Sequence, residues 1–234
     1  NVLAHVDDLH ELLAGIAILL GPDGRLVAEM QYAPDMLLSN AFDTIYHEHR
    51  YIWSLYALER ALDQHGLGLL DAIPIPQHGG SVRIVAGKSG SPHPRVEDLI
   101  DGERSHGIGI PGWAQGTDSR AARFEAQLRE LARTAPQPLA AVGASAKLVT
   151  LTNWLRWHDR PIQWVTDMTP AKQGRYVPGT AIPIVAPDQQ PDQPATVLLG
   201  AWSYLPNMLR KEPGYFDATG HIERGGRLLL PVPV

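Results

Sequence analysis

The sequence predicts a mixed α/β protein built from two units. In the second half, a buried apolar run at 139–142 is followed by a turn of small residues at 143–147, a helix, and another strand at 161–167. This order is typical of a βαβ unit. Helix-like and strand-like runs also alternate in the first half. We therefore expect two α/β units with largely parallel sheets, the first at 1–115 and the second at 116–234.

The composition excludes several classes of function. The 234 residues carry a net charge of −5, so no overall basic field points to a nucleic acid polymer or to a membrane surface. Cysteine is absent, which excludes disulfides and thiolate nucleophiles and suggests a reducing compartment such as the cytoplasm. The longest apolar run, at 12–20, is too short to span a bilayer. Because the sequence lacks an initiator methionine and starts within a structured pattern at Asn1-Val2-Leu3, we expect the chain to begin inside a longer protein.

Each element of the first half has its own signal. Apolar residues recur at helical spacing over 6–20, and Gly21-Pro22-Asp23-Gly24 then forms a turn. A second helix is expected at 52–65, where Gly66 ends it. The strands expected in this half are 25–32, 67–75 and 81–86. The stretch 87–112 is rich in Gly, Pro, Ser and charge, and we expect an excursion or linker there.

In the second half, 121–134 has the apolar spacing of an amphipathic helix, and the small-residue turn opens a helix that extends to about 158. The strands expected here are 139–142, 161–167, 183–186, 196–200 and 227–230.

One polar run concentrates titratable groups. Tyr46-His47-Glu48-His49-Arg50-Tyr51 places two imidazoles, a carboxylate and two phenols within six residues. Imidazole has the side-chain pKa closest to neutrality, so this run can move protons at pH 7. Two other interpretations stay open: a metal pair formed by His47 and His49, or a structural polar cluster. Glu48 beside an imidazole would fix its tautomer and raise its basicity.

Two further motifs suggest ligand contacts. In His78-Gly79-Gly80-Ser81-Val82-Arg83, the glycines allow a ligand to approach the backbone, and Ser81 and Arg83 can bind a phosphate or a sugar hydroxyl. The alternative is a β-turn with a solvated arginine. In Gly143-Ala144-Ser145-Ala146-Lys147, a helix N-terminus and a lysine favour an anion. The alternative there is a close strand–helix contact that requires small residues.

A loop at 167–179 follows the next strand and adds Lys172 and Arg175. Open α/β sheets bind ligands at the carboxyl ends of their strands. With Lys147, these cations predict a local pocket for a phosphorylated small molecule in an otherwise acidic protein.

Taken together, the motifs resemble the C-terminal part of the sugar C-methyltransferases that act on nucleotide-linked keto-deoxysugars. The resemblance covers nearly the whole chain in order, through Asn1-Val2-Leu3-Ala4-His5, the Tyr46 run, the His78 run, the Gly143 turn and Lys172-Gln173-Gly174. It implies that Asn1 to about Lys88 is the second half of a class I methyltransferase domain, which uses S-adenosylmethionine. It implies a Rossmann-like domain after it that helps to hold the nucleotide sugar.

The resemblance also implies a partner and a mechanism. The glycine-rich cofactor turn, and any zinc cysteines, would lie before Asn1 in the N-terminal half of the same protein. A base removes a proton from a carbon next to a ketone, and the resulting enolate attacks the methyl group. His49 matches the base, Tyr46 and Glu48 match its supporting residues, and His5 matches a histidine near cofactor and sugar.

The remaining expected site residues are assigned to binding. The expected substrate-binding residues are His47, His78, Ser81, Arg83, Ser145, Lys147 and Lys172. Asn1 is expected to contact the cofactor, and no metal ligand is expected. The chain departs from the family pattern at Leu148-Val149 and at Ser203, where asparagine is usual. Two other functions stay open: a non-catalytic nucleotide-sugar-binding fragment, and a metal-dependent hydrolase or lyase using His47 and His49.

Overall fold

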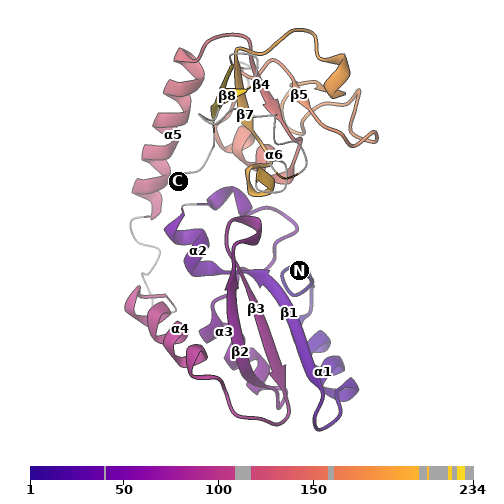
Figure 1. Ribbon diagram of the computed structural model, residues 1–234, viewed down its shortest axis with the longest axis vertical. Helices are drawn as coiled ribbons and strands as arrows, with labels where there is room; N and C mark the ends of the chain where they lie inside the picture. The colour runs from indigo at the N-terminus through magenta and orange to yellow at the C-terminus, as the bar shows by residue number, and fades with distance from the viewer. Residues whose placement is uncertain are drawn as a thin grey trace. The chain divides into compact units, whose positions relative to one another are not determined.

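A computed structural model of the protein describes residues 1–39, 41–108, 117–157, 161–205, 210, 221–222 and 226–229. The chain divides into two compact units, drawn in Figure 1. Unit 1 consists of Asn1–Ala41 and His47–Thr117, and unit 2 of Phe42–Tyr46 and Asp118–Val234. The short segment Phe42–Tyr46 therefore belongs to unit 2, although the residues before and after it belong to unit 1.

Unit 1 combines helices with a three-stranded sheet (Figure 1). Its elements are α1 (Leu9–Leu19), β1 (Arg25–Gln31), α2 (Ala33–Leu38), α3 (Leu55–Asp63), β2 (Gly68–Ile75), the 3₁₀ helix η2 (Gln77–Gly79), β3 (Ser81–Gly87) and α4 (Pro94–Ser105). The apolar sides of these elements form one core. Its fully buried members include Leu13, Met30, Leu55, Leu58, Leu62, Leu67 and Ile84.

The sheet of unit 1 corrects one expectation. Its strand order is β1-β3-β2, and β3 is antiparallel to both neighbours, so the prediction of a largely parallel sheet is wrong for the described part of this unit. The reason is the connection between β2 and β3, which contains only residues 76–80. A parallel pair needs a crossover of about a dozen residues or more, whereas a short turn produces a hairpin.

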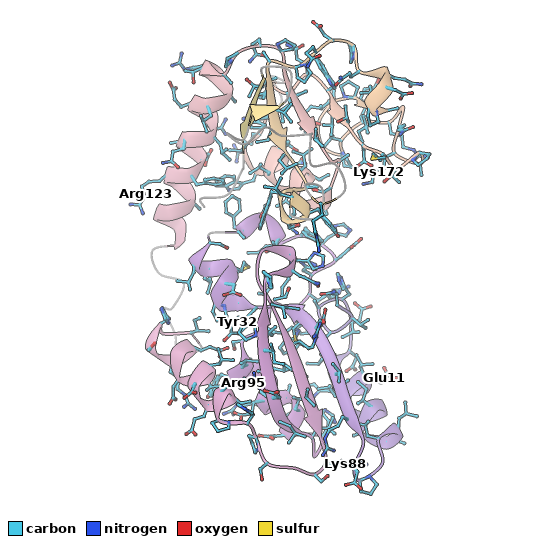
Figure 2. The ribbon with its side chains drawn as sticks, viewed as in Figure 1. Glu11, Tyr32, Lys88, Arg95, Arg123 and Lys172 are labelled. Carbon is cyan, nitrogen blue, oxygen red and sulfur yellow. The ribbon has the colours of Figure 1, made fainter. Side chains whose placement is uncertain are left out.

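A second correction concerns the stretch expected to be a linker, of which 94–105 forms helix α4. Val96 and Ile100 of this helix are buried in the core of unit 1. Arg95 of α4 forms an ion pair with Asp71 of β2 at 2.9 Å, and Figure 2 labels this arginine. The helix was not predicted because the residues on either side of Pro94–Ser105 are rich in Gly and Pro, which favour loops. Residues 109–112 of the expected linker lie outside the described residues.

Unit 2 contains a six-stranded sheet with helices packed on it (Figure 1). Its elements are the 3₁₀ helix η1 (Phe42–Thr44), α5 (Thr117–Thr134), β4 (Leu139–Val142), α6 (Ala146–Trp154), β5 (Val165–Thr166), β6 (Ile184–Val185), η3 (Pro187–Gln189), β7 (Thr196–Leu199), η4 (Trp202–Tyr204), β8 (His221–Ile222) and β9 (Gly226–Leu229). Helix α6 ends at Trp154, before its expected end at about 158. The expected strand end at 230 lies outside the described residues.

The strands of unit 2 follow the order β6-β5-β4-β7-β9-β8. All neighbouring pairs are parallel except β8 and β9, which form an antiparallel pair. Apolar residues of α5 and α6 pack against the sheet, among them Phe124, Leu128, Leu148 and Leu151. This parallel sheet confirms the predicted mixed α/β class and is consistent with a Rossmann-like fold. No helix in the described part of the chain is long and apolar enough to cross a membrane.

Candidate functional site

Three of the predicted site residues meet in unit 1. The rings of His5 and His49 lie 4.9 Å apart between centroids, tilted by 54°. The Nδ1 atom of His5 lies 2.8 Å from the backbone carbonyl oxygen of Glu48. A carbonyl oxygen only accepts hydrogen bonds, so Nδ1 of His5 carries the proton in this contact. In a neutral His5 ring, Nε2 is then left as an acceptor.

The backbone around His49 is fixed to the N-terminal segment of unit 1. The amides of Arg50 and Tyr51 both donate to the carbonyl of Ala4, at 2.8 and 3.3 Å. The Arg50 guanidinium also pairs with Asp7 at 2.6 Å. These contacts bring the segment that carries His5 beside the segment that carries His49. Residues 43 or more positions apart in the sequence are thereby held together.

The exposure of this group differs from one side chain to the next. His49 is half-buried, whereas His5, His47 and Glu48 are exposed. The Glu48 carboxylate lies 3.7 Å from Nε2 of His47 at the surface, a contact that is an ion pair when His47 is protonated. The Glu48 carboxylate thus lies beside His47, and the Glu48 backbone carbonyl binds His5. The expected effect of Glu48 on an imidazole tautomer stays a prediction.

A second group of predicted residues lies in unit 2, where Tyr46 and Lys147 come together. Lys147 is the second residue of α6, and only 7% of its surface is exposed. Its Nζ lies 5.8 Å from the ring centre of Tyr46 and 5.9 Å from that of Trp202. Both distances are within the range of cation–π attraction.

Asp43 completes this group and was not among the predicted residues. It is 2% exposed, and its Oδ2 accepts a hydrogen bond from the Trp202 indole at 2.6 Å. Burial raises the pKa of Asp43 to about 6, although the Trp202 hydrogen bond and the charge of Lys147 oppose the rise. Burial likewise lowers the pKa of Lys147, and the charge of Asp43 opposes that change.

The turn after β4 uses its polar groups within the fold. The Ala144 amide donates to Oδ2 of Asp167 at 2.8 Å. The Ser145 hydroxyl accepts from the Leu148 amide and donates to the Gly200 carbonyl at 2.6 Å. Gly143 adopts a φ of +86°, and a Cβ atom there would lie 2.7 Å from the Cβ of Ala201. These contacts favour the close-packing interpretation of the turn, and its role in anion binding stays a prediction.

Lys172 also has an internal partner. Its Nζ donates to the Ala144 carbonyl at 2.8 Å and to Oδ2 of Asp167 at 3.1 Å. Burial alone would raise the pKa of Asp167, but hydrogen bonds from Thr169 and Lys172 lower it below its usual value. Figure 2 labels Lys172 on the loop that follows β5. The cations predicted to line a pocket are thus balanced in part by Asp43 and Asp167.

The predicted residues of the β2–β3 hairpin make structural contacts. Ser81 is buried, and its hydroxyl donates to the Gln77 carbonyl at 3.0 Å. Arg83 donates from Nε to Glu29 at 2.6 Å, and these residues face each other across β3 and β1. The β-turn interpretation fits these contacts, with an ion-paired rather than a solvated arginine. His78 lies in the turn, at a φ of +56°.

The sequence reasoning gave no role to Asp43, Asp167 or Trp202, although it did single out the loop that begins at residue 167. Asp167 directly follows β5, and Trp202 lies shortly after β7, so both occupy the carboxyl ends of parallel strands. That position is a general signal for functional residues in open α/β sheets. Among the residues that the structure describes, no group of three or more His, Cys, Asp or Glu side chains is placed to hold a metal ion.

Comparison with known proteins identifies the family. Residues 76–233 match the family model of the C-methyltransferase C-terminal domain, and residues 1–72 match a methyltransferase domain. The chain belongs to the C-methyltransferase family. It is 35% identical over 237 residues to the C-methyltransferase NovU of Streptomyces niveus, an alignment that covers 98% of this chain and 55% of NovU. The chain thus spans about half the length of this curated relative. The predicted family resemblance is confirmed.

Proposed function

We propose that the protein containing this chain transfers a methyl group from S-adenosylmethionine to a carbon next to a ketone in a nucleoside-diphosphate-linked deoxysugar. The observation that carries this proposal is the pairing of the His5 and His49 rings, 4.9 Å apart, in a chain of the C-methyltransferase family. A half-buried imidazole beside a second imidazole suits proton transfer near pH 7.

His49 is the proposed base. A proton on a carbon next to a ketone is acidic because its loss gives an enolate, whose charge is delocalised onto oxygen. The neutral His49 ring takes this proton, and the C–H electron pair becomes the carbon–carbon double bond of the enolate. The former carbonyl oxygen then needs hydrogen-bond donors, a role for which the Tyr46 phenol is suited. His5 would support the imidazolium of His49 through its unprotonated Nε2.

Asn1 is the residue proposed to touch the cofactor. Its side chain is exposed, and a carboxamide offers both a donor and an acceptor, which suits the amino-acid end of S-adenosylmethionine. When bound, this cofactor supplies the electrophilic methyl group.

Unit 2 is the proposed holder of the nucleotide part of the substrate. The support is its parallel sheet, with Lys147 and Lys172 placed after the carboxyl ends of β4 and β5. A phosphate bound by Lys147 would lie near the charge of Asp43 as well. A phosphate bound by Lys172 would compete with Asp167 for the same ammonium group. The other proposed substrate contacts are His47, His78, Ser81, Arg83 and Ser145.

The test is methyl transfer by the full-length protein, followed with labelled S-adenosylmethionine and a nucleoside-diphosphate-linked keto-deoxysugar. The variant His49→Gln should lose activity by a factor of about 100 or more, as expected for removal of a general base. His10→Gln is the matched control, because His10 is an exposed histidine of unit 1 that pairs with His65. Unchanged turnover in His49→Gln would remove His49 as the base.

A further inference from the structure

We propose that Asp43 and Trp202 are positioning residues that hold Tyr46, the proposed hydrogen-bond donor to the enolate oxygen, in its place within unit 2. This inference rests on the proposed function of His49. It assigns to unit 2 a task besides the proposed binding of the nucleotide, namely fixing the segment Phe42–Tyr46 that ends at the proposed donor.

The course of the chain is the first observation. Phe42–Tyr46 belongs to unit 2, and His47 begins the next part of unit 1. Tyr46 is the last residue of this segment, and its phenol is the proposed donor to the enolate oxygen. Anchoring the segment on unit 2 therefore restricts where the Tyr46 phenol can lie within that unit.

The anchor has an apolar part, which fixes the segment on the surface of unit 2. The Phe42 ring lies 4.5 Å from the Trp154 ring and 5.6 Å from the Phe124 ring, between centroids. These contacts bury apolar area without setting a direction, because aromatic pairs tolerate several geometries.

The polar part of the anchor sets the orientation. The hydrogen bond between Asp43 and the Trp202 indole is short, 2.6 Å, and joins residues 159 positions apart. The other oxygen of Asp43, Oδ1, is buried without a hydrogen-bond partner among the described residues. Burying a carboxylate with one unpaired oxygen costs free energy. The nearby charge of Lys147 offsets part of that cost. The hydrogen bond to Trp202 gives the segment a direction that the apolar contacts do not.

Trp202 also acts on the far end of the segment. Lys147 places its Nζ close to the rings of both Trp202 and Tyr46. Trp202 therefore touches Asp43 directly and reaches Tyr46 through the ammonium group of Lys147. The Trp202 indole thus contacts Asp43 near the start of the segment and is linked through Lys147 to Tyr46 at its end.

The experiment uses the full-length protein and two readouts. The first is kcat and KM for methyl transfer, and the second is deuterium exchange from D2O into the keto sugar nucleotide without S-adenosylmethionine. Asp43→Ala and Trp202→Phe should each lower kcat and the exchange rate by about 10- to 100-fold, since small displacements of a reacting group have effects of this size. KM for the sugar nucleotide should change by no more than a few-fold.

Two variants make the test specific. Asp43→Asn keeps an oxygen that can accept from the indole, so it should recover most of the activity that Asp43→Ala loses. Asp188→Ala removes an exposed carboxylate from η3 of the same unit and should match the wild type. Rates are expressed per folded molecule, with thermal unfolding measured alongside.

Several results would overturn the inference. One is a Trp202→Phe variant whose kcat and exchange rate equal those of the wild type. If His49→Gln is inactive in the same experiment, the proposed function is not affected by this result. Another is a raised KM with unchanged kcat, which would make Trp202 a substrate-binding residue instead. If Asp43→Ala does not fold, the activities of Asp43→Asn and Trp202→Phe decide whether the inference holds. Full activity in His49→Gln would instead contradict the proposed function itself.

Discussion

Burial and a single hydrogen bond act against each other at Asp43. Burial raises its pKa from 3.8 to about 6, while the indole of Trp202 and the charge of Lys147 lower it. Between these two values the folded protein binds a proton at Asp43 that the unfolded chain has released. The contribution of Asp43 to stability is therefore fully present below pH 3.8 and is lost as the pH rises through about 6.

This linkage predicts the pH dependence of Asp43→Asn. The free energy of unfolding of the variant, minus that of the wild type, should increase between about pH 4 and pH 7, because asparagine has no proton to lose. One pKa unit corresponds to about 1.4 kcal/mol, so the increase should not exceed about 3 kcal/mol. Urea unfolding at several pH values measures it, and Asp188→Asn is the exposed control. A difference that is constant or falls over this interval would contradict the pKa of Asp43.

At the residue scale, sequence reasoning found side chains more readily than their partners. Tyr46, His49 and Lys147 stand in short motifs whose chemistry is visible locally. The group that Tyr46 and Lys147 form also contains Asp43 and Trp202, which are 159 positions apart. No local pattern reports a contact of that separation. For the same reason, the sequence indicated charge on Lys172 but not its pairing with Asp167.

Elements with a clear period were predicted well, and those with mixed signals were not. Helices α1, α3 and α5 and strands β2, β3, β4 and β7 lie within a few residues of their predicted ranges. Helix α4 was missed because its flanks are rich in Gly, Pro and Ser. Strand β8 was missed because two residues are too short to show an alternating pattern.

Helix α4 provides a prediction at this scale through Glu103. This residue is 2% exposed, and its carboxylate accepts from the amides of Leu55 and Tyr56 at 2.6 and 3.0 Å. These are among the first amides of α3, which have no partner within their own helix. Glu103→Gln turns one acceptor into a donor that faces an amide, so it should cost about 1–3 kcal/mol of unfolding free energy.

Glu97→Gln is the matched control, since Glu97 is an exposed glutamate of the same helix. The loss of unfolding free energy in Glu97→Gln should remain well below about 1 kcal/mol. Chemical unfolding of both variants gives the comparison. Equal losses in the two variants would show that Glu103 does not cap α3.

At the scale of the whole molecule, the main departure from the sequence-based prediction is the path of the chain. A division at one boundary was expected, whereas Phe42–Tyr46 is part of unit 2 and lies within a stretch that otherwise belongs to unit 1. Hydrophobic periodicity describes which face of an element is buried, but not the unit in which it is buried. The antiparallel sheet of unit 1 has a similar explanation, because the length of one connection decided its direction.

The proposed chemistry depends on proton abstraction at His49, and one measurement tests that step most directly. The full-length protein is mixed with a nucleoside-diphosphate-linked keto-deoxysugar in D2O, without S-adenosylmethionine, and exchange at the carbon next to the ketone is followed by NMR. We expect the wild type to catalyse this exchange, and His49→Gln to slow it by a factor of about 100 or more while still binding the sugar nucleotide. Exchange at the wild-type rate in His49→Gln, or no catalysed exchange in the wild type, would contradict the account.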